Sequence, residues 1–178
     1  ACLEKKFAFK KGQQVLDGLV CTSSPLDLEA CSASIERPRN KVYQRWLLRR
    51  LVRQTLADPF GVTDREREFL SSKIRASNPT TIRAFDSVIT APRWGYRDVD
   101  AYYSEASPLN KLALFSSCLP PILILQALDD PWVPSCGAQK LAESISFKQC
   151  ERLQVILTKN GGHNGFHGVE GCWGDLLV

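Results

Sequence analysis

The chain of 178 residues has the length of one domain, and its content of 44% hydrophobic and 24% charged residues excludes a disordered protein. No apolar run approaches the roughly 20 residues that a membrane-spanning helix needs. The net charge of +4 does not by itself indicate nucleic acid, and we expect no nucleic-acid partner.

The start of the sequence favours a piece of a longer protein. The sequence contains no Met, so it does not show its own translation start. Residues 1–11 are typical of the last turns of a helix, with Gly12 just past the end. A chain that opens in the middle of a helix is expected to be truncated.

A strand is predicted at residues 15–21, and residues 26–114 are then mainly helical. The strongest helical pattern covers residues 41–56, which carry two rows at i, i+4 spacing. We expect the apolar row to face protein, and it consists of Tyr43, Leu47 and Leu51. We expect the basic row to be exposed, and it consists of Arg45, Arg49 and Arg53.

Further helices are predicted from their start signals. Thr63 and Glu66 have the spacing of a capping box. Another helix is expected from Asn78 and Pro79, with one apolar side formed by Ile82, Phe85 and Ile89. Shorter helices are expected at residues 98–106 and 108–115.

The pattern changes after residue 120. Residues 122–126 form a continuous apolar run, as expected for a parallel strand that is covered on both faces. Residues 135–145 are helical in pattern, and residues 153–157 form the next strand. Strand, helix and strand at this spacing predict parallel pairing, and the fold class is therefore α/β.

Titratable side chains follow the last two predicted strands. Asp129 and Asp130 come after the first of them, and His163 comes after the second, in a Gly-rich loop. Reactive groups collect at the carboxyl ends of strands in open α/β sheets, and neighbouring strands lie about 4.8 Å apart. A carboxylate there could hold the imidazole Nδ1–H and leave Nε2 as a general base. Turn formation by the two aspartates and a surface position for the histidine are the simpler alternatives.

A nucleophile for such a base is missing from the sequence. The nucleophile elbow G-x-S-x-G does not occur. Cys118 and Cys136 do not follow a strand through a tight glycine turn, and packing is the better account of both. The seven cysteines have no C-x-x-C spacing and indicate free thiols, mostly small and buried, in a reducing cytosol.

Several segments together resemble the YheT-like α/β-hydrolases, also called the embryogenesis-associated hydrolases. These segments are residues 25–31 (PLDLEAC), 42–45 (VYQR), 81–92 (TIRAFDSVITAP), 95–96 (GY), 100–103 (DAYY), 107–109 (SPL), 129–131 (DDP) and 161–166 (GGHNGF). The resemblance implies the C-terminal part of an α/β-hydrolase fold, with late parallel strands and flanking helices. Residues 26–115 would then be a helical cap insertion between strands of one partial domain.

The resemblance also implies a serine hydrolase of carboxylic esters, often acylglycerols. Its acid matches the Asp-Asp-Pro segment and its histidine matches His163. We choose Asp130 over Asp129, because hydrolases of this fold usually place the acid just before the turn residue. In α/β-hydrolases the order is Ser, acid, His, so the nucleophile is expected upstream of residue 1 and this chain alone is expected to be inactive.

No metal or other cofactor is expected. His163 and His167 have the i, i+4 spacing of a zinc pair, but that spacing works on a helix and their loop is too rich in glycine. No third ligand is evident in the sequence. We expect His167 at the surface or lining a pocket.

A basic cluster without an acidic residue covers residues 37–57 and contains Trp46. Contact with an anionic membrane surface is one interpretation, contact with RNA phosphates is a weaker one, and a solvated helix face is the simplest. The expected partner is a small-molecule or lipid ester, with an anionic membrane surface as a second option. The expected location is cytoplasmic, with peripheral attachment to a membrane as the alternative. The alternative function is a non-catalytic module that binds a partner or a membrane through this basic helix.

Overall fold

The computed structural model describes residues 16–71, 80–115, 119–148, 151–169 and 171–172. The chain divides into two compact units. The sheet unit takes in the chain up to Asp27 and again from Ser107, and the helical unit is Leu28–Ala106. The predicted helix end at residues 1–11 lies outside the described residues. In the part of the chain that the structure describes, no helix is long and apolar enough to cross a bilayer.

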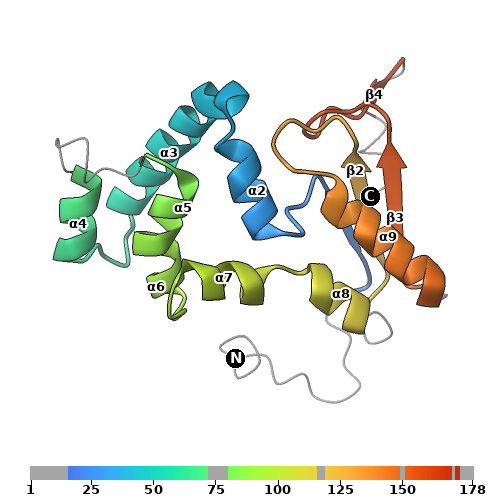
Figure 1. The fold of residues 1–178 in the computed structure, drawn as a ribbon, viewed down its shortest axis with the longest axis horizontal. Helices are drawn as coiled ribbons and strands as arrows, with labels where there is room; N and C mark the ends of the chain where they lie inside the picture. Colours follow the sequence, from blue (N-terminus) through green and yellow to red (C-terminus); the bar gives the residue numbers. More distant parts are fainter. Residues whose placement is uncertain (1–15, 72–79, 116–118, 149–150, 170, 173–178) are drawn as a thin grey trace. The chain divides into compact units, whose positions relative to one another are not determined.

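Three parallel strands form the sheet, in the order β1-β2-β3 (Figure 1). They are β1 (Leu19–Thr22), β2 (Ile122–Ala127) and β3 (Leu153–Thr158). Ile122 in β2 is paired with Leu19 in β1 and with Leu153 in β3. The predicted parallel β-α-β unit is confirmed. β1 begins later than the expected strand at residues 15–21, and it is partly exposed rather than buried, because it has a strand on one side only within this sheet.

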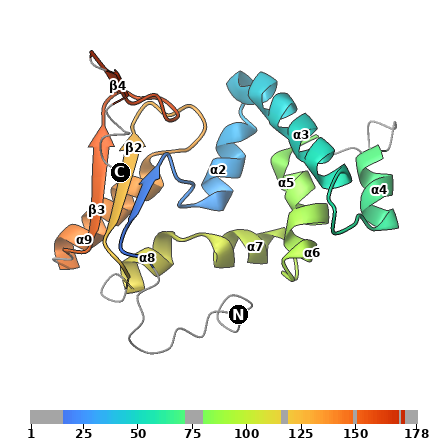
Figure 2. The ribbon, with the colours of Figure 1, turned by 180° about the vertical axis from the view of Figure 1, so that it is seen from behind.

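Both faces of the central strand are covered, as its apolar run predicts. On one face pack α8 (Leu109–Phe115) and α9 (Cys136–Lys148), which Figures 1 and 2 show beside the sheet. The buried cluster under these helices consists of Leu26, Ile122, Ile124, Ala138, Leu141, Ile145 and Leu153. On β2, Leu125 and Ala127 alternate with these residues and lie under Phe166. A short antiparallel pair, β4 (His167–Gly168) and β5 (Gly171–Cys172), follows that phenylalanine.

The helical unit contains short helices around α3 (Lys41–Leu56), whose bounds match the prediction. The other elements are α2 (Leu28–Ile35), the 3-10 helix η1 (Pro38–Asn40), α4 (Asp64–Ser71), α5 (Ile82–Phe85), the π-helix η2 (Asp86–Thr90), α6 (Ala91–Arg93) and α7 (Val99–Ala106). Their shared core is formed by Leu48, Leu70, Ile82, Phe85 and Ile89. The apolar side predicted from Ile82 onward is confirmed, although Asn78 and Pro79 lie outside the described residues. The predicted insertion at residues 26–115 contains the whole helical unit and also α8, which belongs to the sheet unit.

The buried face of α3 is centred one position away from the predicted row. Gln44 and Leu48 are buried, whereas Tyr43, Leu47 and Leu51 are only half-buried beside them. The predicted row therefore forms the margin of the buried face. The prediction missed Gln44 because its side chain is polar, yet this residue is buried in the structure. The basic row of α3 is exposed, as predicted.

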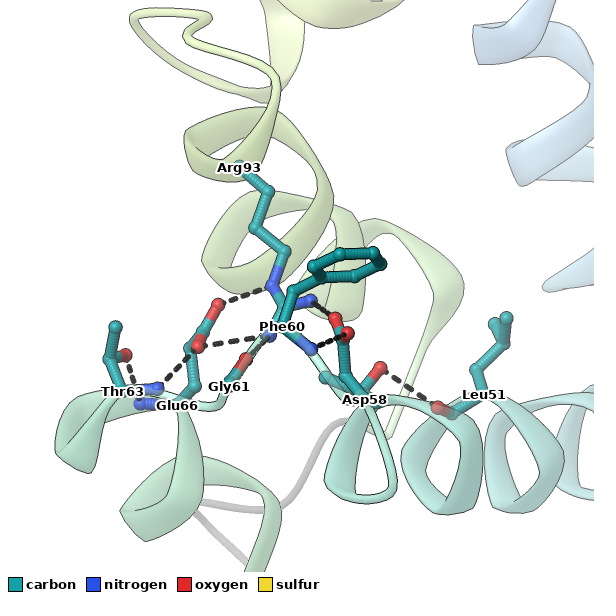
Figure 3. Close-up of polar contacts among 8 residues, drawn as sticks. Leu51, Asp58, Phe60, Gly61, Thr63, Glu66 and Arg93 are labelled. Carbon is teal, nitrogen blue, oxygen red and sulfur yellow. Dashed lines mark hydrogen bonds and ion pairs between the residues drawn. The ribbon is translucent and has the colours of Figure 1, made fainter.

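One arginine joins α6 to the loop between α3 and α4 (Figure 3). Arg93 Nε lies 2.6 Å from Glu66 Oε1, and its guanidinium also contacts the Asp58 carboxylate and the Gly61 carbonyl oxygen. The capping box is confirmed, because the Thr63 N–H donates to Glu66 (2.8 Å) and the Glu66 N–H donates to Thr63 (3.3 Å). The hydrogen bond from Arg93, with that of Thr63, lowers the pKa of Glu66 to about 2 against the opposing effect of burial.

A second polar cluster fixes the π-helix. Asp86, at its start, accepts hydrogen bonds from Thr90 (2.6 Å) and from the Tyr103 hydroxyl (2.8 Å). The Ser32 hydroxyl on α2 lies 3.1 Å from the same tyrosine oxygen. Burial raises the pKa of Asp86, although both hydrogen bonds favour its charged form.

Candidate active site

The candidate site lies where β2 and β3 end side by side. β2 ends at Ala127 and β3 at Thr158, and these two residues are paired in the sheet. The Leu128 N–H donates to the Thr158 carbonyl oxygen (2.8 Å), so the segments that follow β2 and β3 leave the sheet side by side. The loops that carry the aspartates and the histidine therefore begin at one edge of the sheet, as the strand-end argument predicts.

Asp130 is buried and has several hydrogen-bond donors. Its Oδ1 accepts from the backbone N–H groups of Trp132 (2.9 Å) and Val133 (3.0 Å). Its Oδ2 lies 3.3 Å from Nε2 of Gln126, a side chain that is itself buried at the end of β2. Because each oxygen has a donor, the carboxylate is held in one orientation.

His163 lies against this carboxylate. Its Nδ1 is 3.1 Å from Asp130 Oδ2, and its side chain is 26% exposed, so the ring is open to a reactant. A carboxylate oxygen accepts, so Nδ1 donates the hydrogen of this contact, and in the neutral ring with this tautomer the lone pair is on Nε2. The edge contact with the Trp132 ring, at 4.8 Å between centroids, restricts the ring further. The expected proximity of Asp130 and His163 is confirmed by this distance.

The backbone on either side of the histidine is held by two other side chains. The Gly162 N–H donates to Asp129 Oδ1 (2.9 Å), and the Asn164 N–H donates to Ser23 Oγ (3.2 Å). Ser23 is buried just beyond β1 and has a φ of +49°, which is uncommon for a residue other than glycine. The ends of all three strands thus contribute to the position of His163.

Glycine is required in this loop for steric reasons. Gly161 has a φ of +152°, and a Cβ there would lie 2.7 Å from the ring of Phe166. A Cβ at Gly165 would lie 2.8 Å from the Gly161 carbonyl oxygen, which accepts the Gly165 N–H. Phe166 is 2% exposed and fixes the far end of the loop to the sheet.

Other candidates from the sequence do not join this site. His167 is exposed on β4, and no group of three His, Cys, Asp or Glu side chains that could hold a metal occurs among the described residues. Cys136 is exposed at the start of α9, so the packing account of this residue was wrong. Its neighbours Gly137 and Ala138 on the first turn of α9 are buried instead. Cys118 lies outside the described residues.

Sequence reasoning missed three residues of the site, namely Ser23, Gln126 and Trp132. A glutamine that ends an apolar strand was a usable signal for Gln126, because a buried amide needs partners. Ser23 carried no comparable signal, since it meets Asn164 across 141 positions of sequence.

Comparison with known proteins identifies relatives over most of the chain. The candidate esterase YheT of Escherichia coli is 35% identical over 164 residues, which are 89% of this chain and 44% of that protein. Phospholipase ABHD3 of Mus musculus is 35% identical over 147 residues, 81% of this chain and 32% of that protein. The monoacylglycerol lipase of Saccharomyces cerevisiae is 31% identical over 86 residues, 48% of this chain and 17% of that protein. No family model and no solved structure matches the chain.

The fold and these relatives agree on the class of protein, an α/β-hydrolase. The chain belongs to the α/β-hydrolase family, within the group of relatives that includes YheT and ABHD3. It spans less than half the length of these two relatives.

Proposed function

We propose that the protein is a serine hydrolase of carboxylic esters, to which this chain contributes the acid and the base. The observation that carries the proposal is the 3.1 Å contact between His163 Nδ1 and the buried Asp130 carboxylate at adjacent strand ends. In an α/β-hydrolase these positions follow the nucleophile in chain order. The nucleophilic Ser and the oxyanion-hole donors then precede residue 1 in the complete protein.

The chemistry assigned to the pair follows from its geometry. His163 Nε2 removes the proton of the attacking serine hydroxyl, and the alkoxide forms a bond to the ester carbonyl carbon. The imidazolium then gives that proton to the departing alcohol, which leaves an acyl-serine. The same nitrogen then deprotonates a water molecule, whose oxygen forms a bond to the acyl carbon. The bond from that carbon to the serine oxygen breaks, the imidazolium returns the proton to the serine, and the carboxylic acid is released. Asp130 keeps the imidazole in the required tautomer and stabilises its charged form.

The substrate class is taken from the named relatives and is part of the proposal. One relative is named a phospholipase and another a monoacylglycerol lipase. Both names refer to enzymes that act on lipids, so we propose an acylglycerol-type or phospholipid ester as the substrate. No cofactor is required, because proton transfer and acyl transfer use side chains alone.

A non-catalytic binding module is the second candidate. It is favoured by the absence of a G-x-S-x-G motif from the 178 residues and by the exposed basic face of α3. Such a protein would have the α/β-hydrolase fold but would not hydrolyse an ester.

An ester assay separates the two candidates. A short-chain p-nitrophenyl ester would be offered to the protein expressed from its complete coding sequence, to the 178-residue chain, and to a His163→Ala variant of each. We expect hydrolysis by the complete protein only, and its loss in the variant by about 10⁴-fold or more. No hydrolysis in the complete protein would favour the binding module, whereas hydrolysis that is unaffected by His163→Ala would contradict the assignment of His163 as the base.

A further inference from the structure

The outward face of α3 is basic and at the same time apolar at its centre. Val42, Trp46, Arg49 and Arg53 follow at the spacing that places them on one stripe of a helix. Val42 is 79% exposed and Trp46 is 52% exposed, although both are large apolar side chains. Exposed arginines therefore surround an exposed apolar centre.

These arginines have no acidic partners. No Asp or Glu occurs in residues 37–57, and Arg45, Arg49, Arg50 and Arg53 form no ion pair with any residue that the structure describes. A partner protein without negative charge would bury these guanidinium groups unpaired when it bound, at a large cost in desolvation free energy. A partner for this face must therefore bring its own negative charge.

The indole of Trp46 is held in place at the surface. The Tyr43 ring stacks on it at 5.8 Å between centroids, and the Arg50 guanidinium lies 5.6 Å from its centroid. A ring that is fixed outward among cations has an apolar body and a polar N–H, which suits the boundary between lipid headgroups and acyl chains.

An open groove of about 640 Å³ runs along the same helix. Its cations are Arg45, Arg49 and Arg53, and its other lining residues are Leu48, Val52, Leu56, Ala57 and Leu70. Guanidinium groups beside an aliphatic floor match a phosphate and the first carbons of an acyl chain.

We propose that α3 is a docking surface for an anionic phospholipid bilayer, with headgroup phosphates and carboxylates on the arginines and Trp46 at the interface. A base could stack on Trp46, but a bilayer fits this face better than RNA does, because the exposed Val42 and the aliphatic groove contact acyl chains and offer nothing to a base. The proposal stands on the helical unit alone and does not depend on the Asp130–His163 pair.

Vesicle co-sedimentation tests the proposal on the protein expressed from its complete coding sequence. Vesicles of phosphatidylcholine alone are compared with vesicles in which part of it is replaced by phosphatidylserine. The test variant carries Arg45→Glu, Arg49→Glu and Arg53→Glu. The control variant carries Arg65→Glu, Lys111→Glu and Lys140→Glu, which are exposed positions off this face and change the net charge equally. Circular dichroism verifies that both variants are folded.

We expect binding to the phosphatidylserine vesicles only, reduced by high salt. The test variant should bind these vesicles about 100-fold more weakly than the wild type, because each cation near such a surface contributes about 1 kcal/mol. The control variant should bind them more strongly than the test variant does. Trp46→Ala should weaken binding about tenfold and keep the preference for phosphatidylserine.

Three results would overturn the proposal. They are equal binding to both kinds of vesicle, an equal loss in the test and control variants, and binding of single-stranded RNA without binding of vesicles.

Discussion

Asp129 and Asp130 are adjacent, but their carboxylates contact different parts of the histidine loop. Asp130 meets the imidazole of His163, whereas Asp129 accepts the N–H of Gly162. We predict that Asp130→Asn in the complete protein lowers kcat for ester hydrolysis by about 10⁴, because the amide no longer fixes the tautomer or stabilises the imidazolium. Asp129→Asn should cost far less, since its amide oxygen can still accept from Gly162.

Steady-state kinetics of the two variants measure this difference directly. The two substitutions are equal in size and charge and sit side by side, so each serves as the control for the other. A greater loss in Asp129→Asn than in Asp130→Asn would show that the acid is misassigned.

Substitution of two neighbouring glycines in the loop distinguishes the cost of a steric clash from the cost of a positive φ. Gly161→Ala adds a Cβ that collides with Phe166, whereas Gly162 has open space and only a φ of +52°. We predict a loss in the free energy of unfolding of about 2–3 kcal/mol for Gly161→Ala and about 1 kcal/mol for Gly162→Ala. Urea unfolding of both variants gives the comparison, and equal losses would contradict the packing of Phe166 described above.

At the scale of elements, the start of α4 depends on a charged contact with α6. Glu66 is buried and its hydrogen bond from Arg93 lowers its pKa from the ordinary 4.5 to about 2. A carboxylate whose pKa is lower in the folded state stabilises the fold above its unfolded pKa, and this contribution is lost as the pH falls through the folded value. Because the Arg93 side chain is 29% exposed, solvent screening limits the contribution to about 1–2 kcal/mol.

The Glu66→Gln variant tests this pH dependence. We predict that it is less stable than the wild type by a constant amount above about pH 5, and that the difference shrinks as the pH is lowered from 4.5 toward 2. Urea unfolding at a series of pH values measures it, and Asp58, which shares Arg93 with Glu66, is a second carboxylate whose pKa the substitution lowers by removing the negative charge of Glu66. A difference that does not change with pH would assign the role of Glu66 to packing instead.

Elements with local signals were predicted well from the sequence. The bounds of α3 and the capping box of α4 follow from side chains within one or two turns, and both are confirmed. The π-helix Asp86–Thr90 was not predicted, because its start is fixed by Tyr103, which lies 17 residues further on. The burial of Gln44 was missed for a similar reason, since packing against other helices decides it and residue polarity does not.

At the scale of the whole molecule, the candidate site depends on which strands are neighbours. The order Asp then His after consecutive parallel strands was sufficient to predict the contact of Asp130 with His163. The contribution of Ser23 required the position of β1 beside β2, which no local pattern contains. Chain order was sufficient to predict the contact of Asp130 with His163, whereas the contact of Ser23 with the histidine loop depends on the arrangement of the three strands in the sheet.

Covalent labelling with a fluorophosphonate, followed by peptide mass spectrometry, tests the central claim most directly. The reagent modifies a serine only when a histidine activates it. In the protein expressed from its complete coding sequence, we predict one labelled serine that precedes residue 1, with labelling lost in His163→Ala and in Asp130→Asn. The 178-residue chain should remain unlabelled. A labelled serine within the 178 residues, or labelling of the complete protein that persists in His163→Ala, would contradict the account.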